Sequence, residues 1–84
     1  MASYEEMLKE TTEILGKHVD TGRAISPKDH IQNDLGLDSL AVMEVVADVE
    51  DKFHIEIPSA TLDRLFTVED VARALVELQT SKSA

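Results

Sequence analysis

The sequence predicts an all-α fold: a four-helix bundle with three main helices, one short third helix and a long first loop. Apolar residues recur at helical spacing in three stretches, near residues 4–19, 40–53 and 68–78. A candidate N-cap residue precedes each stretch. With 84 residues, 43% of them apolar, the chain can form one modest core. We therefore expect residues 1–84 to form one domain, with a frayed tail at residues 79–84.

The first helix is expected to begin after Ser3 and to end near His18. Ser3-x-x-Glu6 is a capping-box signature, in which the serine and the acidic side chain satisfy free N–H groups at the helix start. The residues at helical spacing are Tyr4, Met7, Leu8, Thr11, Ile14, Leu15 and His18 or Val19. We expect this helix to have a structural role only.

A long loop over residues 19–37 follows, because no period is sustained there. Gly22, Pro27 and Gly36 interrupt the segment. Loops of this length in small domains are usually functional or held in place by their own apolar residues. We expect a short helical turn near residues 27–30, and the expected apolar contacts are Ile25, Ile31, Leu35 and Leu37.

The second helix is predicted over residues 39–53, with Asp38 as its N-cap. Successive helical residues lie about 100° apart around the axis, which separates two faces. The face expected in the core consists of Val42, Val45, Val46, Val49 and Phe53. The roughly opposite face consists of Leu40, Met43, Glu44, Ala47 and Asp51. A face made only for solvent would not need Leu40 and Met43, although scattered exposed apolar residues are ordinary.

The third helix is predicted to be short, over residues 59–65, with Leu62, Leu65 and Phe66 as its apolar contacts. Thr67-x-x-Asp70 is a second capping signature. The last helix follows it, and its apolar side consists of Val68, Val71, Ala72, Leu75 and Leu78.

The charge balance indicates which partners suit the chain. Its 17 acidic and 8 basic residues give a net charge of −9, which argues against nucleic acid and anionic membranes because both attract basic surfaces. No apolar run approaches the ~20 residues of a membrane span. Acidity can serve solubility alone, but the acids concentrate beside Ser39. We expect a cytoplasmic, monomeric protein whose partners present basic patches.

No catalytic residue and no metal site are predicted. A serine nucleophile needs a base within hydrogen-bond reach, and Gly36-x-x-Ser39 is not the Gly-x-Ser-x-Gly elbow of hydrolases. Nothing in the spacing of His18, His30 and His54 suggests a partner for Ser39. The chain has no cysteine, no histidine pair with helical ligand spacing and no acidic run of the EF-hand type.

The segment Gly36-Leu37-Asp38-Ser39-Leu40 resembles the attachment motif of acyl carrier proteins. Asp34-Leu35-Gly36 precedes it, and an acidic helix follows it. The segment Phe53-His54-Ile55-Glu56-Ile57-Pro58 resembles the family's exit from that helix, and Thr67-Val68-Glu69-Asp70-Val71 fits the start of its last helix. The resemblance covers essentially the whole chain, and the family is similarly an all-α four-helix bundle.

The resemblance implies that Ser39 is esterified with the 4′-phosphopantetheine arm of coenzyme A, whose thiol holds acyl groups as thioesters. It implies that a phosphopantetheinyl transferase recognises Asp38, and that acyltransferase, ketosynthase and other synthase enzymes dock through basic patches. The expected docking residues are Leu40, Met43, Glu44, Ala47, Asp51 and Ile57. The residues of a candidate acyl pocket are Val46, Val49, Leu62 and Leu65, for which plain core packing is the competing role.

Two functions from different classes stay open. One is a discrete, non-catalytic acyl carrier protein of polyketide or fatty-acid biosynthesis. The other is a small acidic helical interaction domain without a prosthetic group, for which Ser39 would be dispensable. Ala41, at a position where fatty-acid carriers often have an acid, makes the chain look closer to stand-alone polyketide carriers. Leu37-Asp38 argues against a peptidyl carrier, and the pathway and cargo remain open.

Overall fold

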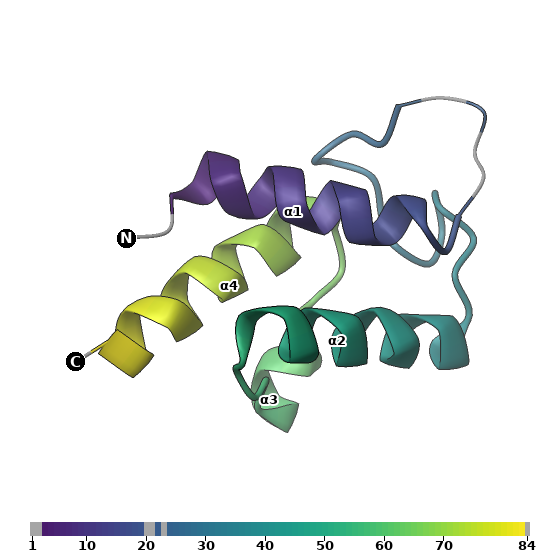
Figure 1. Ribbon diagram of the computed structural model, residues 1–84. Helices are drawn as coiled ribbons and strands as arrows, with labels where there is room; N and C mark the ends of the chain where they lie inside the picture. Colours follow the sequence, from purple (N-terminus) through teal and green to yellow (C-terminus); the bar gives the residue numbers. More distant parts are fainter. Residues whose placement is uncertain (1–2, 20–21, 23, 84) are drawn as a thin grey trace.

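A computed structural model describes residues 3–19, 22 and 24–83. Its helices are α1 (Tyr4–Gly16), α2 (Ser39–Phe53), α3 (Ser59–Leu62) and α4 (Val68–Ser83). α1 packs against α4 and α2, while the short α3 lies below α2 in the view of Figure 1. The predicted all-α bundle, with its long first loop and short third helix, is confirmed. Within the described ranges, no helix has the length and apolar character needed to cross a bilayer.

α1 begins at the predicted N-cap and ends earlier than expected. The Ser3 Oγ accepts a hydrogen bond from the Glu6 N–H, with 3.1 Å between nitrogen and oxygen. The helix ends at Gly16 because the His18 N–H bonds to the Leu15 carbonyl three residues back, at 2.9 Å, in a tighter turn. Glycine at this position favours such an ending, because glycine loses more backbone conformational entropy in a helix than other residues do.

In its described part, the first loop is held in place by its own apolar side chains, as predicted. Residues 27–28 form a turn, and the Asp29 N–H donates to the Ser26 carbonyl at 3.0 Å. Gly36 has a φ of 75°, which residues with a side chain rarely adopt, and this conformation redirects the chain just before α2. The loop residues that enter the core are Ile31, Leu35 and Leu37, with Ile25 partly buried against it.

α3 is shorter than the predicted helix over residues 59–65. It ends at Leu62, and turns follow, in which the Arg64 N–H bonds to the Thr61 carbonyl at 3.0 Å. Leu65 is partly buried as expected, but Phe66 is 55% exposed and is not a core contact. The reason is tertiary: the Phe66 carbonyl accepts the Ile31 N–H at 2.9 Å, so this segment bonds to the first loop and leaves the helix.

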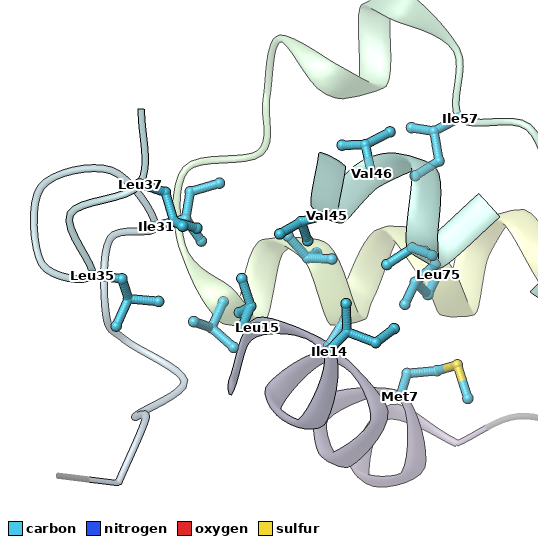
Figure 2. Packing of buried hydrophobic residues seen from close by; sticks show 14 residues of the cluster. Met7, Ile14, Leu15, Ile31, Leu35, Leu37, Val45, Val46, Ile57 and Leu75 are labelled. Carbon is cyan, nitrogen blue, oxygen red and sulfur yellow. The ribbon is translucent and has the colours of Figure 1, made fainter. Parts of the chain in front are cut away.

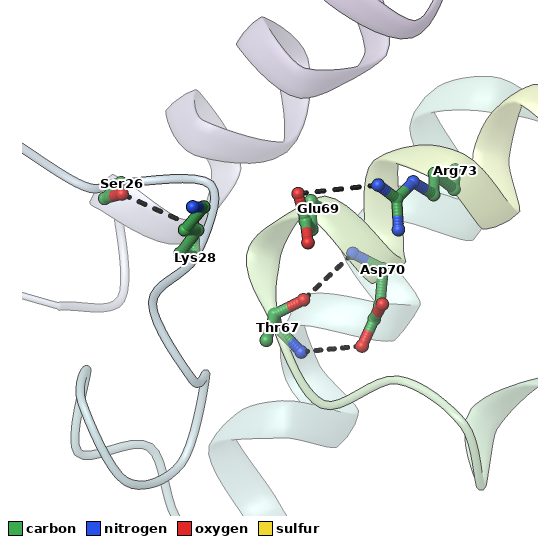
Figure 3. A network of polar contacts seen from close by, with 6 residues as sticks. All are labelled: Ser26, Lys28, Thr67, Glu69, Asp70 and Arg73. Carbon is green, nitrogen blue, oxygen red and sulfur yellow. Dashed lines mark hydrogen bonds and ion pairs between the residues drawn. The ribbon is translucent and has the colours of Figure 1, made fainter.

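α4 starts with the predicted capping box, which Figure 3 shows. The Asp70 N–H donates to the Thr67 Oγ1 at 3.2 Å, and the Asp70 Oδ2 accepts the Thr67 N–H at 3.0 Å. Arg73 pairs with Glu69 one turn earlier, at 3.6 Å. The helix continues to Ser83, the fraying expected at residues 79–84 stays a prediction, and position 84 lies outside the described residues. Residues 79–83 include no glycine or proline that would end the helix.

The carboxyl group of Asp70 illustrates how the cap is maintained. Burial is the largest single influence on it and raises its pKa. Hydrogen bonds from the main chain of Thr67 and Phe66 and from the Thr67 side chain, with the charge of Arg73, act in the other direction and together outweigh burial. The pKa of Asp70 is therefore held below its usual value, and the ionised form stabilises the start of α4.

The core lies where α1, α2, α4 and the first loop meet (Figure 2). Val49 of α2, Leu15 of α1 and Leu75 of α4 have at most 1% of their surface exposed. Thr11 is also fully buried, and it is tolerated because its hydroxyl donates to the Met7 carbonyl at 2.7 Å. The cluster consists of Met7, Ile14, Leu15, Ile31, Leu35, Leu37, Val45, Val46, Val49, Ile57, Val68, Val71, Ala72 and Leu75.

Candidate functional site

Ser39 is the first residue of α2 and is exposed. Asp38 is the N-cap, as predicted, and its Oδ1 accepts the Ala41 N–H at 2.8 Å. The free N–H groups in the first turn of a helix favour a negative charge beside them. A phosphate ester on the Ser39 oxygen would therefore fit this position both sterically and electrostatically.

The exposed face of α2 carries the residues that periodicity separates from the core. Leu40 is 71% exposed and Met43 is 54% exposed, although both are large apolar side chains. Among described residues, only Phe66 is another exposed large apolar side chain. We call the exposed α2 set the docking face; its members are Leu40, Met43, Glu44, Ala47 and Asp51, all of which are exposed.

Polar contacts that the sequence did not reveal join one edge of α2 to α1 and to the residues just after it. Asp48 Oδ2 lies 2.8 Å from His18 Nε2, and Lys52 is paired with Glu10. The hydrogen bond to Glu10 is the main cause that raises the pKa of Lys52 above its usual value, partly opposed by desolvation and supported by the charges of Glu10 and Glu13. These contacts join residues far apart in the chain, so no short-range pattern signals them.

Ile57 corrects one expectation about the docking surface. Its side chain is only 6% exposed and belongs to the core cluster, so it does not extend the exposed face of α2. The cause is a hydrogen bond of 2.8 Å from the Ile57 N–H to Glu50 Oε2, which holds the segment after α2 against the helix. The Glu50 carboxylate therefore accepts a hydrogen bond from the protein's own backbone. Glu44 and Asp51 remain the acids of the docking face.

A cavity of about 350 Å³ lies between α2, α3 and the first loop, and its lining includes Ser39 and Met43. Its wall contains all four residues of the candidate acyl pocket: Val46, Val49, Leu62 and Leu65. The other lining residues could not be predicted from the sequence, because they come from elements that only the tertiary fold brings together. These are Leu15, Ile31, Gln32, Leu37, Val42, Val45, Ile57, Ser59, Asp63 and Val71.

The histidines do not form a catalytic arrangement with Ser39 in the described structure. His18 is engaged with Asp48, and His30 accepts hydrogen bonds through Nδ1 within the first loop. His54 caps the C-terminal end of α2 with a φ of 55°, which places it ~22 Å along the helix axis from Ser39. No group of three or more metal-binding side chains occurs among the residues that the structure describes.

The comparisons with known proteins agree with this geometry. The family described as "Phosphopantetheine attachment site" matches residues 6–75. The chain is 41% identical over 78 residues to an acyl carrier protein of Streptomyces coelicolor, covering 90% of this chain and 85% of the relative. It is 37% identical over 71 residues to an acyl carrier protein of Myxococcus xanthus, covering 83% and 90%.

A third relative aligns over almost its whole length. An acyl carrier protein of Campylobacter lari is 35% identical over 79 residues, with 94% of this chain and 99% of the relative covered. Members of this family are carriers and not catalysts, and their prosthetic group is 4′-phosphopantetheine. From the fold, the exposed serine at the start of α2 and these similarities, we conclude that the chain belongs to the acyl carrier protein family.

Proposed function

We propose that Ser39 carries the 4′-phosphopantetheine arm. The observation that carries this proposal is the position of Ser39, which is exposed at the first turn of α2 and also lines the adjoining cavity. The arm would supply the thiol that this cysteine-free chain lacks, and an acyl group would be held on it as a thioester. Asp38 orders the first turn and is our candidate for recognition by the phosphopantetheinyl transferase.

We propose that the cavity beside Ser39 receives the acyl chain. Its inner wall is apolar and includes Val46 and Val49, whereas Gln32, Ser59 and Asp63 add polar groups. Burying a methylene group in such a site stabilises the bound state by roughly 0.8 kcal/mol. Leu62 and Leu65, on the short α3 and just after it, are partly buried and form another side of this wall.

The acyl carrier role implies contacts with synthase enzymes and with a phosphopantetheinyl transferase. We propose the docking face as the surface for these contacts. Leu40 and Met43 would enter apolar pockets on the partner, because exposed apolar side chains gain most from burial. Glu44 and Asp51 would meet basic patches on acyltransferases, ketosynthases and related enzymes, which would increase the association rate and set the orientation.

For the pathway, we propose either polyketide or fatty-acid biosynthesis. We also propose a monomer in the cytoplasm, which a sedimentation run and cell fractionation would test. The competing function, an acidic interaction domain without a prosthetic group, differs in predicting that no arm is ever attached to Ser39.

The deciding experiment is an intact-mass measurement before and after incubation with coenzyme A, magnesium and a broad-specificity phosphopantetheinyl transferase. Ser59→Ala is the matched control for Ser39→Ala, because both serines are exposed, begin a helix and line the same cavity. Wild type and Ser59→Ala should gain one phosphopantetheine, and Ser39→Ala should gain none. A gain on Ser39→Ala, or none on folded wild type while a known carrier is loaded, would refute the proposal.

A further inference from the structure

His30 begins the turn that leads to Ser39, and its ring acts as the cap of that turn. Its Nδ1 lies 3.2 Å from the Gln32 nitrogen and 3.0 Å from the Asn33 nitrogen. These are the second and third residues after His30, whose N–H groups an N-cap side chain receives in a helix. Because a backbone N–H can only donate, Nδ1 is the acceptor of both hydrogen bonds.

Asp34 completes this small motif from the other end. Its Oδ2 accepts the His30 N–H at 2.7 Å, and its own N–H donates to the His30 carbonyl at 2.9 Å. The Leu35 N–H reaches the same carbonyl at 3.1 Å. The Asp34 side chain thus satisfies the His30 N–H, while the imidazole accepts from Gln32 and Asn33, an arrangement similar to a capping box, although no regular helix follows.

The capped turn is bonded directly to the segment before Ser39. The Gln32 carbonyl accepts the Gly36 N–H at 3.0 Å, and the Ile31 carbonyl accepts the Leu37 N–H at 3.3 Å. Gln32 and Ser39 also line the same cavity. Gln32 therefore connects His30 to this segment. Its N–H is bonded to the His30 ring, and its carbonyl is bonded to Gly36 in the approach to Ser39.

The linker before α4 holds His30 from the other side. The Ile31 N–H donates to the Phe66 carbonyl at 2.9 Å, and His30 and Thr67 form an isolated β-bridge. The His30 and Phe66 ring centroids lie 6.2 Å apart with the ring planes inclined at 35°. Phe66 is thus kept on the surface with its ring beside the imidazole, which limits the orientations that the imidazole can adopt.

We propose that His30 is a positioning residue for the modification of Ser39 and that it acts through the acceptor at Nδ1. The inference rests on the proposed attachment at Ser39. Without that acceptor, the N–H groups of Gln32 and Asn33 lose their side-chain partner. The turn then loses its cap, Ser39 is less precisely presented to the transferase, and loading becomes slower.

The two segments that meet at His30 carry further charged groups, which the variants must leave in place. They are Lys28, Asp29, Asp34, Asp63, Arg64, Glu69 and Asp70. His30→Asn and His30→Ala change none of them. Asparagine is also a good N-cap acceptor, whereas alanine offers no acceptor.

The test is a competition in which two proteins share limiting transferase and coenzyme A, and intact mass follows the loading of each. The ratio of the two loading rates gives the ratio of kcat/KM. His30→Ala should load about fivefold more slowly than wild type, the factor expected for one lost cap. His30→Asn should load within about twofold of wild type, because asparagine restores an acceptor at the cap.

Two results would overturn the inference: His30→Ala loading as fast as wild type, or His30→Asn loading as slowly as His30→Ala. A second readout does not need the transferase. The amide hydrogens of Gln32 and Asn33 should exchange with solvent faster in His30→Ala than in wild type and His30→Asn, and equal exchange rates in the three proteins would also overturn it. If folded wild type is never loaded while a known carrier is, the proposed function fails, and amide exchange alone decides the role of His30.

Discussion

Two carboxylates on α2 are predicted to have separable roles although they are three residues apart. Asp48 lies on the edge of the helix that faces α1 and is bonded to His18, whereas Asp51 lies on the docking face and has no ion-pair partner among the described residues. Asp48→Lys should therefore lower stability with little effect on docking. Asp51→Lys should slow docking with little effect on stability.

The structure sets the size of each effect. The Asp48 side chain is 51% exposed, so its contact with His18 is discounted to the range of a surface pair, about 0.5 kcal/mol. For a domain of this size, this corresponds to a decrease in Tm of about 2–4 °C. Reversing Asp51 replaces attraction to a basic patch by repulsion, which we expect to reduce the association rate about three- to tenfold at low salt.

Melting curves and association rates test whether the two roles are separate. Both are measured on wild type, Asp48→Lys and Asp51→Lys. The association rate with a phosphopantetheinyl transferase is measured by stopped flow at several salt concentrations. The deficit of Asp51→Lys should shrink with salt, because the Debye length decreases from about 10 Å at 0.1 M to about 3 Å at 1 M. If Asp48→Lys and Asp51→Lys slow association equally, or if the deficit persists in high salt, the assignment of the two edges of α2 is wrong.

Three further predictions concern stability and the cavity. Val49→Ala should lower the free energy of unfolding by about 2 kcal/mol, because it removes two buried carbons and leaves a void; a loss below about 0.5 kcal/mol in urea titration would contradict the packing. Asp70→Asn should lower Tm at neutral pH, and the difference from wild type should vanish as the pH falls below the ordinary value of 3.8 and through the lowered pKa of Asp70; a constant difference would contradict the linkage. An acyl chain on the arm should raise Tm relative to the unacylated arm, and Leu62→Phe, which fills the cavity, should reduce that increase; an unchanged increase would place the chain elsewhere.

The helices and their caps could be predicted because they depend on neighbours in the chain. The spacing of apolar residues identified the buried stripe of α2, and Asp38 and the Thr67–Asp70 pair were recognised as caps from short signatures. The same spacing placed Leu40 and Met43 away from the core, where the structure exposes them. The resemblance indicated the family, which the comparisons confirm, while the modification of Ser39 itself stays a prediction.

The errors occurred where contacts between distant segments decide the outcome. Phe66 was expected in the core, but its carbonyl bonds to Ile31 in the first loop and its side chain stays exposed. Ile57 was expected on the surface, but its N–H donates to the Glu50 carboxylate and its side chain is buried in the core cluster. Neither position has a local signature, because a hydrogen bond between segments leaves no periodic trace in the sequence.

The sequence by itself determined that the chain forms three main helices, which faces of α2 are apolar, and that Ser39 stands at a helix start. These properties follow from local geometry, since side-chain spacing and caps act within a few residues. Only the tertiary structure decided which residues enclose the cavity, that Asp48 serves the fold while Asp51 faces solvent, and that the imidazole of His30 caps the turn before Ser39. Each of these depends on segments packed together by burial of the shared core, and burial has no direction along the chain.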